Sequence, residues 1–361
     1  MKIAYISHLS TNIAAGPNWS VPAGIRAQEQ IDEVLWINTT DVVMPHWKDV
    51  KAYNNLKDLG GKLCLDILPM SFRRPDVVVF EGIYFTEYVK FAKELRRENI
   101  PYIIVPRGSM THQAMHNHAW LKKWVAHKLF FNRFIRHAWK IQYLTQQEAF
   151  DSCKQFKTPF FIVPNGVTLP SITKDNFSTK GIKALFIGRI DLYHKGLDLL
   201  LDAVTQAKEY LRKDNFHLDM YGPRRYDFYK IREEISKRDI NDIVELHDEV
   251  GGQAKQEVLL NTNLFVMTSR FEGHPMGLIE ALAYGIPCLV TPGTNMAEEV
   301  ESANAGWVCQ GNVESIAATI ISIIEQKKSL SKKGENARAL SLQYDWTCLA
   351  NRFHNEIHEF E

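Results

Sequence analysis

The chain has 361 residues and carries 43 Lys and Arg against 42 Asp and Glu, a formal net charge of +1. The balance of charges argues against a bulk nucleic-acid binder, and no apolar run in the sequence is long enough to cross a bilayer. A chain of this length is too long to fold around one hydrophobic core, which indicates two domains.

The first half of the sequence predicts strands that alternate with helical stretches, in the ranges 2–6, 34–37, 77–80, 102–105 and 141–143. The first strand starts at once, without a basic-then-apolar signal sequence, so we expect a cytoplasmic protein. The five cysteines are scattered and form no CxxC pair, which favours reduced thiols over disulfides or a zinc site. We place a domain boundary near Thr168, giving domains at 1–168 and 169–344 and a last helix at 345–361.

A basic and aromatic stretch lies at 120–140, inside a segment from Asn99 to Gln147 that has no Asp or Glu. Its cations and rings are Lys122, Lys123, Lys128, Arg133, Arg136 and Lys140, with Trp120, Trp124, Phe130, Phe131, Phe134 and Trp139. Such a helix can lie on an anionic membrane surface, where each cation contributes about 1 kcal/mol. The alternative is a first-domain helix with core aromatics, whose cations face a phosphate-bearing acceptor or water. No RNA-binding motif accompanies it, so we expect no nucleic-acid partner.

A strand, loop and helix open the second domain. Residues 184–187 predict a strand, Gly188 allows a sharp turn at its end, and Gly196 opens an amphipathic helix. Arg189 and Lys195 lie in the connecting loop, at the carboxyl edge of the predicted sheet. Two fixed cations at this place would stabilise a departing nucleoside diphosphate more in the transition state than in the ground state.

The stretch 269–291, SRFEGHPMGLIEALAYGIPCLVT, carries the most information. It follows a predicted buried strand and predicts a tight loop, a helix and a further strand. The helix therefore points its amino end at the carboxyl edge of a parallel sheet, which is an anion site. Glu272 and Glu280, eight positions apart, would flank a bound diphosphate and accept hydrogen bonds from hydroxyls. This arrangement suits a nucleotide-sugar.

The E-x7-E pattern within an EG-x-P loop resembles the donor-site signature of the retaining glycosyltransferases of family 4. The resemblance implies an α/β protein of the GT-B fold, in which two Rossmann-like domains face each other across a cleft. It places the nucleotide-sugar donor on the second domain and the acceptor on the first, with the last helix packing back on the first domain. Residues 160–167 resemble the passage that links the domains, 219–223 the turn that approaches the nucleotide, and 245–255 the loop that covers the base.

The same resemblance assigns roles to individual residues. Glu272 orients the sugar hydroxyls, Glu280 holds the ribose, and Arg189 with Lys195 stabilises the diphosphate. His274 occupies a loop position that is often aromatic or aliphatic in relatives, and we expect it to tune the choice of sugar unless its backbone amide alone matters. The wider set of expected donor-binding residues is Gly16, Gly188, Gly222, His274, Pro275, Met276, Gly277, Leu278 and Glu280.

The first domain departs from the family pattern. Many relatives carry a glycine pair after the first strand, whereas this chain has the single Gly16, followed by a proline. Where many relatives place a histidine after the fourth strand, residues 105–109 read VPRGS and resemble the P-R-G branch. Arg107 and His112 are the candidates for contact with donor or acceptor, and Glu81 is a candidate for holding an acceptor hydroxyl. For His112 the alternative is a hydrogen-bonded surface histidine.

The resemblance implies a retaining hexosyltransferase that moves a sugar from a UDP- or GDP-sugar to a glycan or lipid-linked acceptor in surface-polysaccharide biosynthesis. Neither a general base nor a carboxylate nucleophile can be assigned, which favours a reaction on one face of the sugar. No Asp-x-Asp motif stands at a strand end, so we expect no essential metal. We also expect no cofactor. The expected location is the cytoplasm, including the inner face of the membrane. The alternatives are a GT-B sugar-nucleotide epimerase, which needs acid/base carboxylates, and a non-catalytic descendant that binds glycan or nucleotide-sugar.

Overall fold

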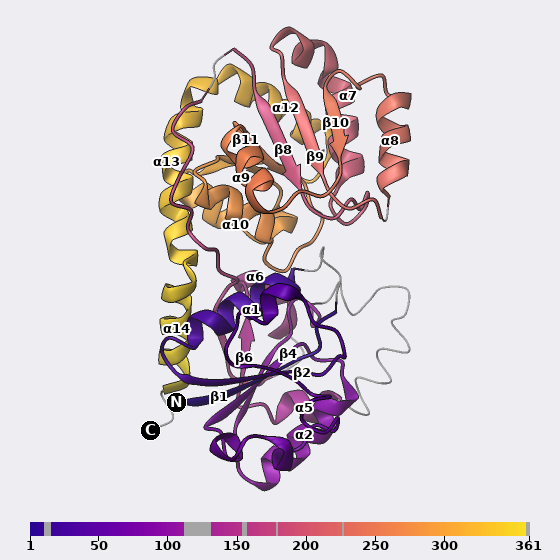
Figure 1. Cartoon of the computed structure of the whole chain (residues 1–361). Coiled ribbons are helices and arrows are strands. Elements are labelled where there is room, and N and C mark those ends of the chain that lie inside the picture. Colours follow the sequence, from indigo (N-terminus) through magenta and orange to yellow (C-terminus); the bar gives the residue numbers. More distant parts are fainter. Residues whose placement is uncertain (11–15, 112–130, 154–156, 178–179, 226, 359–361) are drawn as a thin grey trace. The chain divides into compact units, whose positions relative to one another are not determined.

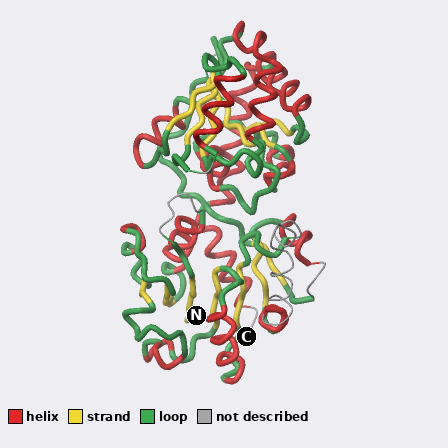
Figure 2. Tube along the Cα trace, turned by 90° about the vertical axis from the view of Figure 1, so that its right-hand side faces the viewer, coloured by secondary structure: helices red, strands yellow, loops and turns green. Residues whose placement is uncertain are grey.

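The structure is a computed structural model that describes residues 1–10, 16–111, 131–153, 157–177, 180–225 and 227–358. The chain divides into two compact units. The first contains Met1–Gly166 together with Trp346–Glu361, and the second contains Val167–Asp345. In both units parallel strands lie at the centre and helices surround them (Figure 2).

In the described part of the first unit, the strands form a seven-stranded parallel sheet of order β3-β2-β1-β4-β5-β6-β7 (Figure 1). The strands are β1 (Lys2–Ser7), β2 (Glu33–Asn38), β3 (Tyr53–Asn55), β4 (Val77–Glu81), β5 (Tyr102–Val105), β6 (Lys140–Tyr143) and β7 (Phe160–Ile162). Strand order reverses between β1 and β4, so this is the point at which the loops after both strands open a crevice.

Helices cover both faces of this first sheet. They are α1 (Pro17–Gln28), α2 (Thr86–Arg97), α5 (Asn132–Arg136), α6 (Gln146–Cys153) and α14 (Trp346–His358). One face packs against α2 and α5, and the other packs against α1 and α14. The alternation along β1 explains this, since Ala4 and Ile6 belong to one buried cluster while Ile3 and Tyr5 belong to the other.

Among the residues described in the second unit, the strands form a six-stranded parallel sheet of order β10-β9-β8-β11-β12-β13. The strands are β8 (Lys183–Ile187), β9 (His217–Tyr221), β10 (Val244–His247), β11 (Leu264–Met267), β12 (Cys288–Val290) and β13 (Gly306–Val308). The helices are α7 (Leu197–Lys213), α8 (Phe228–Lys237), α9 (Gly252–Leu260), α10 (Met276–Ala283), α11 (Ala297–Ser302), α12 (Val313–Glu325) and α13 (Leu330–Ser341).

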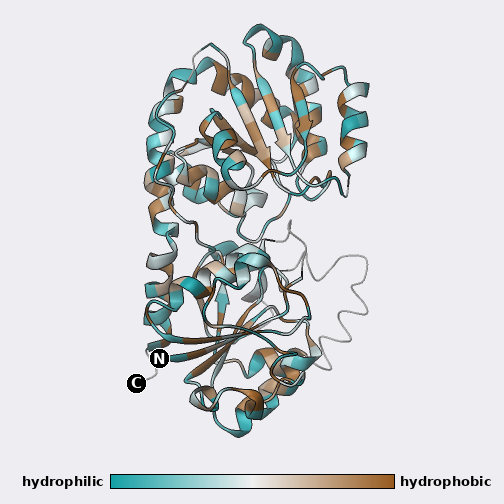
Figure 3. Ribbon diagram, viewed as in Figure 1, coloured by the Kyte–Doolittle hydropathy of each residue, from teal (hydrophilic) through white to brown (hydrophobic). Residues whose placement is uncertain are grey.

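The core of the second unit also lies on two faces of its sheet. One buried cluster joins the strands to α7, α8 and α12, and the other joins them to α10, α11 and α13. Figure 3 shows the apolar residues gathered on the strands and on the inner sides of the helices. Among the described helices, none combines the length and the apolar character that crossing a membrane requires.

The last helix of the chain, α14, is held in the first unit by a buried carboxylate. Asp32 accepts hydrogen bonds from the amino group of Met1 (2.7 Å) and from Gln28, and its carboxylate lies 2.9 Å from Nδ1 of His354 on α14. Although burial alone would raise the pKa of Asp32, these partners lower it. The carboxylate thereby ties α14 to the start of the chain.

The strands predicted from the sequence are present, with ends shifted by at most one residue. Two strands at the edges of the first sheet, β3 and β7, have no strand prediction in the sequence, because each has only three residues and no periodic pattern can develop over that length. Residues 160–167, expected as a linking passage, contain β7 before the chain leaves the first unit after Gly166.

Strand β13 lies so close to β12 that it needs a glycine. A Cβ built on Gly306 would overlap the carbonyl oxygen of Cys288 on the neighbouring strand, whereas one built on Gly311 would meet nothing within 4 Å. We predict that Gly306→Ala lowers the free energy of unfolding of the second unit by about 1–3 kcal/mol, the usual cost of overpacking. Chemical denaturation followed by circular dichroism measures this, with Gly311→Ala as the matched control. Equal stabilities of the two variants would contradict the packing described for β13.

Candidate functional site

The strand order of the second sheet reverses between β8 and β11, and the loops that follow these two strands meet at that place. The loop after β8 carries Arg189 and Lys195, and the loop after β11 carries Glu272 and His274. The structure therefore brings two motifs that lie some 80 residues apart in the sequence to one edge of the sheet.

Lys195 and Glu272 form an ion pair at this edge. The Nζ atom of Lys195 lies 2.6 Å from Oε1 of Glu272, and both side chains are about nine-tenths buried. The hydroxyl of Ser269 donates a hydrogen bond to the same oxygen, at 2.6 Å. Asn295, in the loop after β12, donates a hydrogen bond to the backbone carbonyl of Glu272. This contact ties the loop that carries Glu272 to the loop after β12. These contacts orient Glu272, and the ion pair brings the cation of Lys195 next to it.

Glycine allows the two loops to approach each other. Gly196 has a φ of +61°, and a Cβ on it would overlap the carbonyl oxygen of Thr268 at the end of β11. A bidentate ion pair then joins the loops: Arg270 donates to Asp198 at 2.7 and 2.8 Å and to the carbonyl of Tyr193 at 2.7 Å. The distance between Lys195 and Glu272 therefore depends on these contacts.

Helix α10 points its amino end at the same place. It begins at Met276 after Pro275, and the first N–H groups of a helix have no acceptor within the helix. A Cβ on Gly277 would lie 2.9 Å from the carbonyl oxygen of Ile187, so this helix start lies directly against the end of β8. Leu278 is fully buried and anchors the first turn in the core. The helix start is a ready site for an anion.

The turn after β9 lies against the turn after β8 and completes the group of loops at this sheet edge. A Cβ on Gly222 would overlap the carbonyl oxygen of Gly188, so any side chain at this position would push the two turns apart. Glycines 188, 222 and 277, which the sequence proposes for donor binding, are thus gathered at the carboxyl ends of β8 and β9 and at the start of α10.

Glu280 has a partner that sequence reasoning did not single out. Its Oε2 atom lies 2.5 Å from Nζ of Lys255 on α9, and both side chains are about a quarter exposed. Lys255 falls inside the stretch that resembles the base-covering loop, but nothing in the sequence indicates which acid it meets. The pair places a further cation next to the second glutamate of the motif.

Arg189 is partnered inside its own loop. Its guanidinium contacts Nδ1 of His194, and it lies 3.6 Å from a carboxylate oxygen of Asp191. Burial lowers the pKa of His194, so its ring is neutral near pH 7 and accepts a hydrogen bond from the guanidinium. The ring also lies 4.1 Å from that of Phe271 in the second loop. The sequence did not predict a role for His194.

His274 is a neutral side chain in the site. Its ring is buried beside Tyr344, with 5.3 Å between the ring centroids. Burial lowers the pKa of His274 to about 3. At neutral pH this imidazole therefore offers one N–H donor and one lone pair but no positive charge.

The comparisons with known proteins bear on the family and on the fold. Residues 170–340 match the family model of glycosyl transferases group 1. This match spans most of the second unit. Over its full length the chain resembles the crystal structure of Anabaena HepE in complex with UDP, with a TM-score of 0.77 at 15% identity and coverage of 100% of both chains. The predicted GT-B fold is confirmed.

Two relatives in sequence have names that concern lipid-linked sugars. A GDP-mannose:cellobiosyl-diphosphopolyprenol alpha-mannosyltransferase of Xanthomonas oryzae is 24% identical over 301 residues, covering 80% of this chain and 75% of that protein. An N,N'-diacetylbacillosaminyl-diphospho-undecaprenol alpha-1,3-N-acetylgalactosaminyltransferase of Campylobacter jejuni is 31% identical over 98 residues, covering 27% of this chain and 26% of that protein.

The first unit joins two residues that the sequence proposes separately. Arg107, with a φ of +52°, donates to Glu81 at 2.7 Å, to Ser20 at 3.1 Å and to Asn165 at 3.0 Å. The backbone N–H of the next residue, Gly108, donates to the buried carboxylate of Glu148. Arg107 is thus held at the carboxyl edge of the first sheet, beside a small cavity of about 50 Å³ that its side chain helps to line.

Some of the other residues predicted for the first unit lie in its described part, and some lie outside it. Gly16 lies at the start of α1, where its carbonyl accepts hydrogen bonds from the N–H groups of Trp19 and Ser20. His112 and residues 112–130 lie outside the described part. Of the basic and aromatic stretch 120–140, Phe131 and Phe134 are buried in the core, while Arg133 and Arg136 are exposed. For these aromatics the core interpretation holds.

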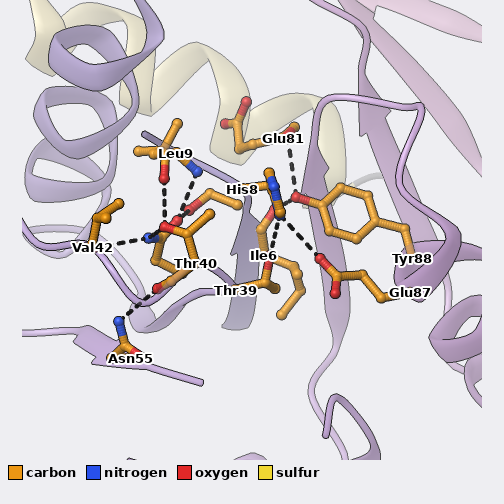
Figure 4. Close-up of polar contacts among 12 residues, drawn as sticks. Ile6, His8, Leu9, Thr39, Thr40, Val42, Asn55, Glu81, Glu87 and Tyr88 are labelled. Carbon is orange, nitrogen blue, oxygen red and sulfur yellow. Dashed lines mark hydrogen bonds and ion pairs between the residues drawn. The ribbon is translucent and has the colours of Figure 1, made fainter. Parts of the chain in front are cut away.

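A polar cluster that sequence reasoning missed lies where the first sheet reverses its strand order (Figure 4). Nδ1 of His8, directly after β1, lies 2.8 Å from the hydroxyl of Thr39 and 3.2 Å from a carboxylate oxygen of Glu87. The ring of His8 stacks on Phe85 with 4.3 Å between centroids. The sequence feature that could have indicated this cluster is the polar Ser7-His8 pair at the end of an apolar strand.

The buried His274 makes stability depend on pH. Because its folded-state pKa of about 3 lies below the usual 6.5, the unfolded chain binds the extra proton first as the pH falls. This lowers the free energy of unfolding by about 2 kcal/mol between pH 7 and pH 5, and the loss continues toward pH 3. We predict that His274→Gln removes this part of the acid sensitivity in urea titrations at both pH values. A substitution at the exposed His137 serves as the control, and a His274→Gln variant with undiminished acid sensitivity would contradict the assignment.

Proposed function

We propose that this chain is a retaining glycosyltransferase that moves a hexosyl group from a nucleotide-sugar to a lipid-linked glycan acceptor. The observation that carries the proposal is the Lys195–Glu272 pair beside the amino end of α10, at the reversal point of the second sheet. A cation, a carboxylate and helix N–H groups at one strand edge suit a sugar diphosphate, which combines negative charge with hydroxyl donors.

In the proposed reaction, binding of the donor exchanges partners within this site. The diphosphate accepts hydrogen bonds from Lys195, from Arg189 and from the start of α10, and Lys195 swings from Glu272 to the phosphate. Glu272 is then open to accept hydrogen bonds from the sugar hydroxyls. As the bond from the anomeric carbon to the phosphate oxygen breaks, the growing charge on that oxygen meets groups that are already oriented.

Retention follows when the acceptor attacks from the side on which the diphosphate leaves. The acceptor oxygen bonds to the anomeric carbon, and its proton moves to the departing phosphate oxygen, so that charge and atoms balance without a protein base. The neutral His274 contributes a hydrogen bond and no charge, which suits recognition of a sugar hydroxyl. In this proposal Glu280, whose carboxylate pairs with Lys255, holds the ribose. We propose that no cofactor and no metal take part in this reaction.

The proposal for the acceptor is supported by the two relatives, whose names specify diphosphopolyprenol-linked sugars. Such an acceptor carries its own diphosphate and a lipid, and it would bring the enzyme to the cytoplasmic membrane face in surface-polysaccharide assembly. In the first unit, Arg107 with Glu81 and His8 with Glu87 are the described groups at the carboxyl edge that can contact it. The exposed Arg133 and Arg136 are available to an anionic surface.

The donor site can be tested by nucleotide binding alone. Titration calorimetry of UDP, GDP and ADP should give saturable binding of one of them, and Lys195→Ala should weaken it about 10- to 100-fold, the worth of a charge-assisted hydrogen bond. Glu280→Gln should weaken nucleotide binding by about tenfold, because the proposed hydrogen bond from the ribose to the carboxylate is lost. The matched control is Lys237→Ala, an exposed lysine on α8 that pairs with Glu234. If no nucleotide bound the wild-type chain, a non-catalytic descendant would become the better account.

The stereochemistry of the product tests the retaining reaction. With the donor identified by binding, we predict that proton NMR shows the same anomeric configuration in the product as in the nucleotide-sugar. An inverted product would contradict the one-face mechanism while leaving the donor site itself intact. A released free sugar nucleotide with altered stereochemistry would instead indicate the epimerase alternative.

A further inference from the structure

Strands β9 and β10 have one polar face, which is unusual for neighbouring parallel strands in a sheet that helices cover. Leu218 and Met220 on β9, and Val244 on β10, point into the core and are fully or almost fully buried. The residues between them form the opposite face, where Tyr221 at the end of β9 packs against the second buried cluster. That face carries His217, Asp219, Glu245 and His247, all at least partly exposed. Four side chains that can bind metals therefore share one face of these two strands. Strand β10 is the edge strand of the sheet, with β9 beside it (Figure 1).

The strand register places the two carboxylates opposite each other. Asp219 pairs with Glu245, and His247 pairs with Tyr221 one step further along. Like charges directly across a strand pair repel and destabilise it. The arrangement therefore favours a positive charge between the carboxylates, which a histidine or a cation can supply.

The distances within the patch match those between ligands of one metal ion. Nε2 of His217 lies 3.3 Å from Oδ1 of Asp219 and 3.8 Å from Oε2 of Glu245, and one ligand atom from each of the three residues lies within 4.8 Å of the others. Bonds of about 2.0–2.1 Å in a tetrahedral zinc site separate the ligand atoms by about 3.3 Å. A small movement of the exposed Glu245 side chain would complete this geometry.

A fourth residue holds one of these ligands in place. Nε2 of His247 lies 2.7 Å from Oδ1 of Asp219, and the ring of His247 stacks on Tyr221 with 4.5 Å between centroids. Carboxylates that bind metals are commonly oriented by a hydrogen bond of this kind. His247 therefore serves as a positioning residue in this patch.

We propose that His217, Asp219 and Glu245 form a binding site for one divalent transition-metal ion of the zinc type. The donor set of one imidazole and two carboxylates favours Zn²⁺, Co²⁺ or Ni²⁺ over Mg²⁺ and Ca²⁺, which prefer oxygen ligands alone. On binding, the lone pair of Nε2 of His217 bonds to the ion and replaces the present contact with Asp219. The three ligands lie on β9 and β10, whereas the proposed contacts to the diphosphate come from the loops after β8 and β11 and from the start of α10. The proposal gives the ion no part in sugar transfer.

The test uses the full chain, freed of metal with a chelator and titrated with ZnCl₂ by calorimetry. We expect one Zn²⁺ per chain, and a loss of affinity of about tenfold or more in both His217→Ala and Glu245→Gln. Glu245 is exposed and the glutamine keeps its size, so this variant reports on binding even if His217→Ala fails to fold. The control is His137→Ala, which removes an exposed histidine from the first unit and should leave binding unchanged.

Cobalt gives an independent readout of geometry. Co²⁺ added to the metal-free chain should produce the visible absorption bands of a low-coordinate site, and one equivalent of Zn²⁺ should abolish them. Two results would overturn the proposal: no saturable binding of Zn²⁺, or binding of equal strength in the wild type, His217→Ala and Glu245→Gln. None of these readouts requires sugar transfer, so failure of the metal site and failure of the proposed function are distinguishable.

Discussion

The close approach of the loops after β8 and β11 is the constraint on which the donor site depends. Gly196 must adopt a positive φ against the end of β11, and Gly277 must let α10 start against the end of β8. With these two close approaches in place, Nζ of Lys195 lies 2.6 Å from Oε1 of Glu272. The bidentate Arg270–Asp198 pair then fixes the two loops to each other. Backbone packing thus decides the chemistry of the site.

Each charged residue proposed for the donor already has a partner within the second unit. Lys195 lies on Glu272, Glu280 lies on Lys255, and Arg189 lies on His194. These pairings lower the cost of burying charge in the absence of substrate. A sugar diphosphate can replace them one for one, because its phosphates take up the cations while its hydroxyls donate to the carboxylates. Binding then exchanges partners without leaving a buried charge alone.

Much of the second unit could be predicted from its sequence, because its motifs are local. The strand before Gly188, the loop at Glu272 and the helix from Met276 each follow from periodicity and turn residues over fewer than 20 positions. The meeting of Arg189 and Lys195 with Glu272 at one sheet edge follows from the strand–loop–helix order and from the rule for parallel sheets.

Pairings that depend on strand order or on helix packing could not be predicted. Lys255 and Glu280 meet because α9 lies beside α10, and Arg107 meets Glu81 because β4 and β5 are neighbours. The contact of His8 with Glu87 likewise requires β1 to pair with β4, across some 75 residues of sequence. A sequence pattern gives the residue types at each strand end but not which ends lie side by side.

A crystal structure of the chain with its bound nucleoside diphosphate tests the central claim most directly. The account predicts the diphosphate at the amino end of α10, with Nζ of Lys195 moved from Glu272 to a phosphate oxygen and Glu280 within hydrogen-bond distance of the ribose. A nucleotide bound elsewhere, with the Lys195–Glu272 pair unchanged, would contradict it.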